Sequence, residues 1–140
     1  NGYEVRPLAY GMRLFAIGGH GKQLAITNPA STNLAAYATL DSKTIFITLV
    51  NKAHGPGAAN SEIQIKLDAP VAGSDAQAIF LASKNGNLSA SSTGVTLGGA
   101  PIKEDGTWDG HWTPLKPTNS NLLTVSMPPA SAAVIRANLR

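Results

Sequence analysis

The sequence predicts one amphipathic helix near its start and only short strands after it. Pro7 favours the first helical position, because its missing N–H would be unpaired there in any case. Leu8, Met12 and Phe15 occupy positions i, i+4 and i+7 and therefore share one face. The pair Gly18-Gly19 is expected to end the helix by supplying a left-handed residue. A lone apolar helix before an all-β region indicates a nearby domain boundary and an apolar face that needs a partner.

The rest of the chain carries the pattern of half-buried antiparallel strands. Residues 62–67 show it most clearly, because apolar and polar side chains alternate strictly there. Residues 44–50 are apolar and β-branched, as expected for a central strand. A short loop at 41–43 should join that strand to another at 33–40. We expect these three strands to be neighbours in one meander.

Further strands are expected at residues 24–28, 76–82, 95–97, 122–127 and 132–138. Turn-forming pairs such as Asn-Gly, Gly-Gly, Asp-Gly and Pro-Pro separate them. Seven or eight short strands of this kind predict an all-β fold, an antiparallel β-sandwich, with an open barrel as the alternative. The expected organisation is a helix within residues 1–21 and a β-sandwich domain at residues 22–140.

Composition argues against several classes of protein. The chain has no cysteine, which excludes disulfides and thiolate metal sites. Its 11 Lys and Arg residues are scattered singly, whereas nucleic-acid binding normally needs a clustered basic stripe. No apolar run approaches the roughly 18 residues of a membrane span. We therefore expect no metal, no cofactor, no nucleic-acid partner and no membrane partner.

Motifs for catalysis are not found in the sequence. The three histidines, His20, His54 and His111, have no zinc-site spacing and are expected in surface loops. There is no Gly-x-Ser-x-Gly elbow to support a hydrolase nucleophile. A glycine-rich loop that cradles phosphate is not found before a helix either.

The segment 105–112 is the densest polar and aromatic stretch and holds both tryptophans. Exposed tryptophans can stack on sugar rings while Asp and His side chains bind hydroxyl groups, which makes the segment a candidate carbohydrate site. That site would consist of Asp105, Trp108, Asp109, His111 and Trp112. The structural alternative is a long connection that buried tryptophans pin to the sandwich or to a neighbouring domain.

Two other interpretations of this segment find less support. Oxygen ligands at 105, 107 and 109 resemble the start of a calcium loop, but the expected glycine and the distant glutamate are missing. Glu104, Asp105 and Asp109 offer carboxylates for glycoside hydrolysis. Catalytic carboxylates need a cleft on a rigid scaffold, however, and these lie in one loop.

Several stretches carry a family resemblance. Residues 5–15, Val-Arg-Pro-Leu-Ala-Tyr-Gly-Met-Arg-Leu-Phe, look like an "RPLYYG…LF" segment, and residues 45–52 are similar to a strand ending in Asn-Lys. Residues 95–102 and 127–135 resemble closing strands of the same domain. The family that these stretches resemble is glycoside hydrolase family 79, the heparanase and β-glucuronidase family, and the resemblance spans nearly the whole chain.

The resemblance implies an architecture and a function. In that family a (β/α)₈ barrel carries two catalytic glutamates, and a β-sandwich packs on the side of the barrel. The first segment here would be the last barrel helix, with Leu8, Met12 and Phe15 packing on the barrel. Nothing in this sequence matches the motifs around either glutamate, so no catalytic residue is expected. The family's sandwich is also usually completed by a strand from the protein's N-terminus, which we do not find here.

The implied function is a non-catalytic accessory domain of a retaining glycoside hydrolase that acts on glucuronic-acid-containing saccharides. One alternative is a carbohydrate-binding module that uses Trp108 and Trp112, with an acidic polysaccharide as its ligand. Another is the smaller piece of a cleaved enzyme, still associated with its barrel. The first residue is Asn and no signal peptide is visible, so a processed or partial polypeptide is expected, from a secreted or periplasmic protein.

Overall fold

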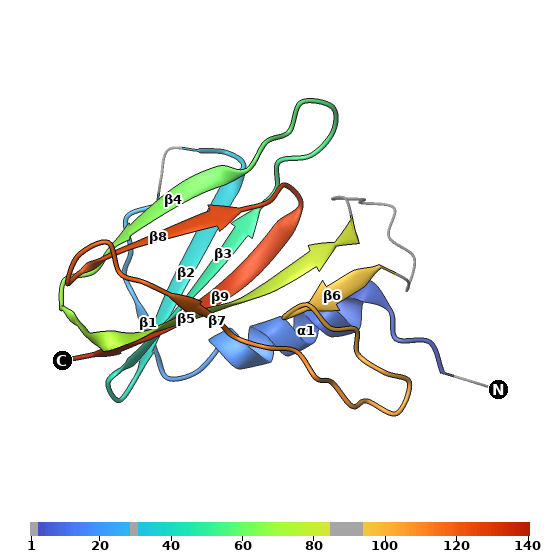
Figure 1. Cartoon of the computed structure of the whole chain (residues 1–140), viewed down its shortest axis with the longest axis horizontal. Helices are drawn as coiled ribbons and strands as arrows, with labels where there is room; N and C mark the ends of the chain where they lie inside the picture. Colours follow the sequence, from blue (N-terminus) through green and yellow to red (C-terminus); the bar gives the residue numbers. More distant parts are fainter. Residues whose placement is uncertain (1–2, 29–30, 85–93) are drawn as a thin grey trace.

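The computed structural model describes residues 3–28, 31–84 and 94–140 (Figure 1). Within these ranges it contains the helix α1 (Pro7–Gly18) and nine strands, all paired antiparallel. The strands are β1 (Lys22–Leu24), β2 (Leu34–Asp41), β3 (Thr44–Asn51), β4 (Ser61–Lys66), β5 (Val71–Ser83), β6 (Val95–Leu97), β7 (Thr113–Leu115), β8 (Leu122–Met127) and β9 (Ser131–Leu139). The prediction of an all-β antiparallel sandwich preceded by one helix is confirmed.

Seven strands form a large sheet and two form a small one. The large sheet has the order β1-β2-β3-β9-β5-β6, and β7 also pairs with β5. This is possible because β5 is long: β7 pairs with residues 76–78 and β6 with residues 81–83 of the same edge. The small sheet consists of β4 and β8, which lie side by side in Figure 1.

The expected three-strand meander is wrong at its third strand. β2 and β3 form the expected hairpin, with Ser42 in the left-handed region at φ 56°. β4, however, pairs with β8, and the place beside β3 is taken by β9. The physical reason is burial on two faces. β9 is apolar along most of its length and suits the middle of a covered sheet, whereas Glu62 and Lys66 of β4 need water on one side.

Three local expectations also change. The strand expected at 24–28 lies earlier, at Lys22–Leu24, and the three-residue β7 with its central Pro114 was not expected. Gly19 caps α1 at φ −90°, so the pair Gly18-Gly19 does not supply the left-handed residue. That residue is Gly21, at φ 78°, where a Cβ would collide with the Leu40 carbonyl.

Both faces of the large sheet are buried, in two separate clusters. Between the sheets, β4 and β8 cover one face, and that cluster includes Ile47, Leu49, Leu123, Val125 and Ile135. On the other face α1 and β6 build a second cluster of Tyr10, Leu14, Ile79, Val95, Leu97 and Val134. Successive side chains of a strand point to opposite faces, so β9 supplies both clusters. The result is three layers: helix, large sheet and small sheet.

Candidate functional site

The helix α1 presents two apolar faces with opposite environments. On the inner face, Tyr10 is 1% exposed and Leu14 is 4% exposed. On the outer face, Leu8, Met12 and Phe15 are 75%, 64% and 77% exposed. The three residues that the sequence placed on one face therefore lie together on the surface. Their packing against a barrel stays a prediction.

The inner face fixes how the helix is seated. The Tyr10 hydroxyl accepts a hydrogen bond from the Ile102 N–H at 3.0 Å. At the other end, the Gly18 carbonyl accepts one from the Thr39 hydroxyl at 3.1 Å. A Cβ at Gly18 would lie 2.6 Å from the Thr48 hydroxyl oxygen and 2.9 Å from a Val134 methyl carbon. These close contacts determine the rotation of α1 about its axis and thereby direct the other face outward.

The outer face is the largest group of exposed apolar side chains on one described element. Tyr3, just before the helix, is also exposed. Single exposed apolar residues are ordinary, but a contiguous group of large ones marks an interaction surface. With 12 residues, α1 is too short to cross a membrane, and the described residues contain no helix that would. The arrangement suits packing against another protein surface.

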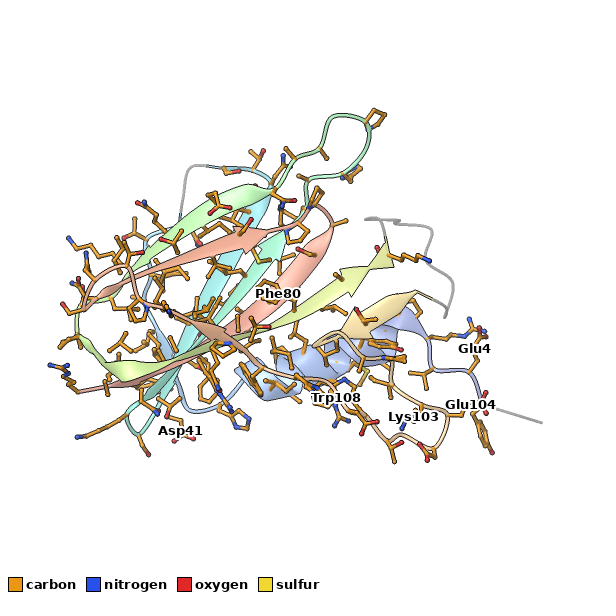
Figure 2. All side chains as sticks on the ribbon, in the orientation of Figure 1. Glu4, Asp41, Phe80, Lys103, Glu104 and Trp108 are labelled. Atoms are coloured by element: carbon orange, nitrogen blue, oxygen red, sulfur yellow. The ribbon has the colours of Figure 1, made fainter. Side chains whose placement is uncertain are left out.

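The segment that the sequence offered as a carbohydrate site packs against this helix. The Trp108 indole N–H donates a hydrogen bond to the Leu97 carbonyl at 2.8 Å. The Arg13 guanidinium of α1 lies 4.7 Å from the centre of the Trp108 ring. Figure 2 shows Trp108 beside the helix. A Cβ at Gly110 would collide with the same ring, which requires glycine there. Trp108 is thus held by β6, by α1 and by its own loop.

The other tryptophan is held in a similar way. Trp112 is half-buried in the cluster under α1, and the Arg136 guanidinium lies 4.0 Å from its ring centre. A cation over an aromatic face is attracted by the ring quadrupole. Each tryptophan therefore already has an arginine on one face, where a sugar ring would otherwise stack.

The carboxylates of this segment have partners within the loop. Asp105 accepts hydrogen bonds from the Thr107 hydroxyl at 2.6 Å and from its N–H at 2.9 Å, which lower the pKa of Asp105. Lys103 donates to Asp109 at 2.8 Å, and this ion pair lowers the pKa of Asp109 and raises that of Lys103. These contacts shape the loop. The role of the five proposed residues in binding a carbohydrate stays a prediction.

The histidines lie in loops, as expected. His20, His54 and His111 are all exposed and outside helices and strands. The His20 ring lies 5.5 Å from that of Phe46, and a ring nitrogen of His54 is 2.8 Å from the Lys52 carbonyl. Across the described ranges, no group of three or more His, Asp or Glu side chains is placed to hold a metal ion.

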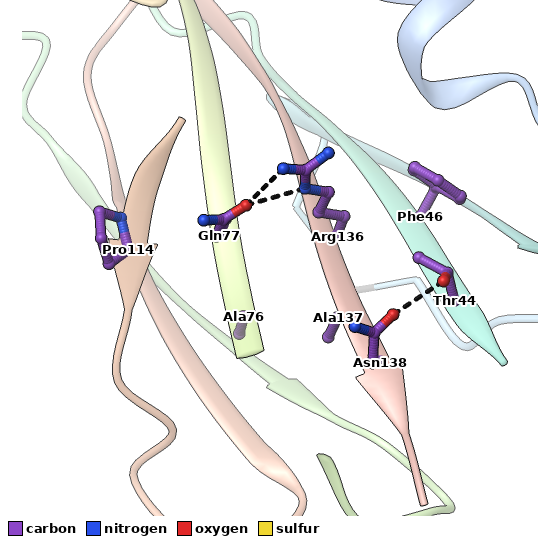
Figure 3. Close-up of a pocket in the computed structure, with 8 residues that line it drawn as sticks. All are labelled: Thr44, Phe46, Ala76, Gln77, Pro114, Arg136, Ala137 and Asn138. Atoms are coloured by element: carbon purple, nitrogen blue, oxygen red, sulfur yellow. Dashed lines mark hydrogen bonds between the residues drawn. The ribbon is translucent and has the colours of Figure 1, made fainter. Parts of the chain in front are cut away.

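A pocket on the helix side of the large sheet was not predicted from the sequence. It has a volume of about 580 Å³ and is bordered by β3, β5, β7 and β9 (Figure 3). Its lining is formed by Thr44, Phe46, Ala76, Gln77, Pro114, Arg136, Ala137 and Asn138. The register places Gln77 and Phe46 on either side of Arg136. No local motif joins these residues, so only strand pairing could have revealed them.

No protein-family model and no curated protein matches the sequence. Solved structures do match. A GH30 endoxylanase from Clostridium papyrosolvens C71 matches with a TM-score of 0.61 and 16% identity, over 94% of this chain and 28% of that chain. CelM2, a bifunctional glucanase-xylanase from a metagenome library, matches with a TM-score of 0.64 and 15% identity, over 96% of this chain and 22% of that chain. The MgGH51 α-L-arabinofuranosidase matches with a TM-score of 0.65 and 16% identity, over 98% of this chain and 20% of that chain.

These likenesses show the fold. The chain spans less than a third of the length of each of these three proteins. At such low identity, shared architecture does not carry over a substrate or a site. The named families are 30 and 51, whereas the sequence resembled family 79. The β-sandwich with its leading helix is therefore an architecture that occurs as a part of larger glycoside hydrolase chains.

Proposed function

We propose that this chain is the accessory β-sandwich of a glycoside hydrolase and that it docks through the outer face of α1 onto a catalytic (β/α)₈ barrel. The observation that carries the proposal is the exposure of Leu8, Met12 and Phe15 on a helix whose other face is already buried. The match of nearly the whole chain to parts of glycoside hydrolases supports it. By its resemblance, the parent enzyme belongs to family 79 and acts on glucuronic-acid-containing saccharides.

Burial of the outer face contributes a favourable free energy that is comparable to the cost of association. Fully covering a large aliphatic or aromatic side chain contributes roughly 1.5–3 kcal/mol. The outer face holds three such side chains, and association of separate molecules costs at least about 4 kcal/mol in lost freedom. Packing is therefore favourable when the two domains belong to one chain or to a preformed complex, because the effective concentration is then high.

The acidic residues of this chain take no catalytic role in the proposal. A retaining glycosidase holds its two carboxyl groups about 5–5.5 Å apart across the scissile bond. Glu62 lies on β4, Glu104 lies beyond β6 and Glu4 precedes α1, and none of them stands in a segment that matches the motifs around a catalytic glutamate. The two glutamates of the reaction would be supplied by the barrel.

The small sheet offers a second support. Among the described strands, β4 pairs with β8 and its other edge has no partner strand. Ile63 and Ile65 of β4 are only half-buried, although they point into the core between the sheets. An added strand from the N-terminal part of the parent protein would pair with this edge and cover these side chains. We expect the parent to be secreted or periplasmic.

The source polypeptide provides the first test. Intact-mass measurement of the native protein, with sequencing of the gene upstream of the codon for Asn1, should show a barrel that precedes this chain in the same polypeptide or copurifies with it. A native protein that consists of these residues alone and runs as a monomer would contradict the proposal.

Surface substitution in the parent enzyme provides the second test. Leu8, Met12 and Phe15 would be changed together to serine, which should lower the melting temperature of the parent while leaving the melting of the isolated chain nearly unchanged. Ile26→Ser, at an exposed apolar residue outside α1, is the matched control. Equal effects of the two variants on the parent would place the interface elsewhere.

Activity provides the third test. The purified chain should not hydrolyse an aryl glucuronide, whereas the parent enzyme should. Reproducible turnover by the chain alone would locate catalytic groups in the sandwich and would refute an accessory role.

A further inference from the structure

The pocket of Figure 3 occupies the part of the sheet face that α1 leaves uncovered. The helix ends over Thr48 and Val134, where Gly18 makes its close contacts. Two residues further along the two strands are Phe46 and Arg136, which line the pocket. A volume of about 580 Å³ lies within the range of small-molecule sites.

Arg136 is held in a fixed position within this pocket. Its Nε and Nη2 both donate to the Gln77 side-chain oxygen, at 2.9 and 2.6 Å. Its guanidinium also lies over the Trp112 ring at 4.0 Å. These contacts use two of the five N–H donors of the guanidinium. The group is therefore preorganised, with donors left over.

Among the side chains that the structure describes, which do not include those of Ser74 and Asp75 on β5, no carboxylate forms an ion pair with Arg136. Asp41 pairs in register with Thr44 and shares this face of the sheet, but it forms no ion pair with the guanidinium. A half-buried guanidinium fixed by a neutral amide favours a planar anion, and a carboxylate matches its fork of donors.

The remaining lining suits a hydroxylated ring. The Asn138 side-chain oxygen accepts a hydrogen bond from the Thr44 hydroxyl at 2.8 Å, which leaves the Asn138 amide group as a donor toward the pocket rim. The amide group of Gln77 is a second donor, because its oxygen is the part that Arg136 uses. Phe46 and Pro114 add apolar surface, against which the C–H face of a sugar ring packs well.

We propose that this pocket binds a sugar acid, with the carboxylate on Arg136 and ring hydroxyls on the amide groups of Gln77 and Asn138. The proposal concerns a binding site in the sandwich and does not depend on a catalytic partner. The test therefore uses the chain by itself.

Binding would be followed by NMR on the ¹⁵N-labelled chain during titration with D-glucuronate. D-Glucose serves as the neutral ligand with the same ring, and acetate as the carboxylate without a ring, at matched ionic strength. We expect saturable shifts at Phe46, Gln77, Arg136 and the Trp112 indole with glucuronate. Affinity for glucose and for acetate should be lower by about tenfold or more, because each lacks one part of the contact.

Three variants assign the effect to the guanidinium. Arg136→Gln should weaken glucuronate binding by about tenfold or more, because charge-assisted hydrogen bonds to the carboxylate are lost. Gln77→Glu keeps the size of the side chain and gives Arg136 an internal carboxylate, so it should abolish binding in a folded protein. Arg13→Gln removes the arginine on the other tryptophan, outside the pocket, and should leave binding unchanged. Thermal melting of each variant confirms that it is folded.

Several outcomes would overturn the proposal. One is an absence of saturable shifts with glucuronate, and another is equal binding of glucose, which would exclude a role for the carboxylate. Equal binding of acetate would reduce the pocket to a general anion site without selectivity for a sugar. Retained binding in folded Gln77→Glu would place the ligand away from Arg136.

Discussion

Both faces of α1 carry large apolar side chains, yet one face belongs to the core and the other lies on the surface. The inner face consists of Tyr10, Leu14 and Gly18, and the outer face of Leu8, Met12 and Phe15. The outer face is the one whose i, i+4, i+7 spacing predicted an amphipathic helix from the sequence. A glycine and a tyrosine hydroxyl proved more decisive for docking onto the sheet.

Close approach, more than hydrophobicity, selects the packed face of this helix. Gly18 allows the helix to come within contact of Thr48 and Val134, and Tyr10 places its hydroxyl against a backbone N–H. The three outer side chains have no comparable complement in the described part of the chain. Their apolar character is then left for a partner, as the proposed function requires.

The largest effect is expected from equal truncations on the two faces. Leu14→Ala deletes a buried side chain and leaves a cavity between α1 and the sheet, which should lower the free energy of unfolding by about 3 kcal/mol. Leu8→Ala makes the same change on the outer face and should change the free energy of unfolding by no more than about 0.5 kcal/mol relative to the unsubstituted chain. Urea denaturation of both variants measures the difference. Equal losses would mean that the outer face is also packed in the isolated chain.

Two glycines of the helix provide the next contrast. Gly18→Ala would place a Cβ at 2.6 Å from the Thr48 hydroxyl oxygen and should destabilise the fold by about 1–3 kcal/mol through overpacking. A Cβ at Gly11 meets nothing within 4 Å, so Gly11→Ala should stabilise the fold by about 0.5–1 kcal/mol through helix propensity. Thermal and urea unfolding should move in opposite directions for the two variants. A stable Gly18→Ala protein would show that close approach is not what seats the helix.

The polar anchor of the inner face has a smaller expected effect. Tyr10→Phe keeps the ring but leaves the half-buried Ile102 N–H without its acceptor. The expected loss is about 1–2 kcal/mol in the free energy of unfolding. Hydrogen exchange at the Ile102 amide should accelerate together with this loss. Unchanged exchange would indicate that the hydroxyl is not the acceptor in solution.

Much of this fold was predictable from local pattern. Pro7 begins α1, and the alternation of apolar and polar residues located β4, β8 and most of β9. These features depend on residues close in sequence, so the periodicity reports them directly. The partner of β4 was not predictable in this way, because a strand pattern states which face is buried but not which sheet the strand joins.

The candidate sites show the same division. The stripe of Leu8, Met12 and Phe15 was visible because its residues are three and four positions apart on one helix. The pocket around Arg136 was not, since its residues come from β3, β5, β7 and β9 and meet only through strand register. The tryptophan segment was noticed for its composition, but which groups Trp108 and Trp112 contact depends on the helix and sheet that they pack against.

The smallest effect on stability is expected from the Lys103–Asp109 ion pair, in the loop that carries Trp108. The hydrogen bond and charge of Lys103 lower the pKa of Asp109 below its ordinary value of 3.8, with a further contribution from His111. A carboxyl group whose pKa is lower in the folded state stabilises that state above its unfolded pKa. This stabilisation is lost as the pH falls from about 4 through the folded pKa. Since both side chains are exposed, the loss in stability should be slight.

Lys103→Met should raise the pKa of Asp109 toward the ordinary value, as followed by NMR of the labelled carboxyl carbon. Lys66→Met, on β4 at the other side of the fold, should leave it unchanged. If Lys103→Met leaves the pKa of Asp109 where it was, the ion pair does not order this loop. The position of α1 would then depend on Trp108, Tyr10 and the close contacts of Gly18, without a contribution from this ion pair.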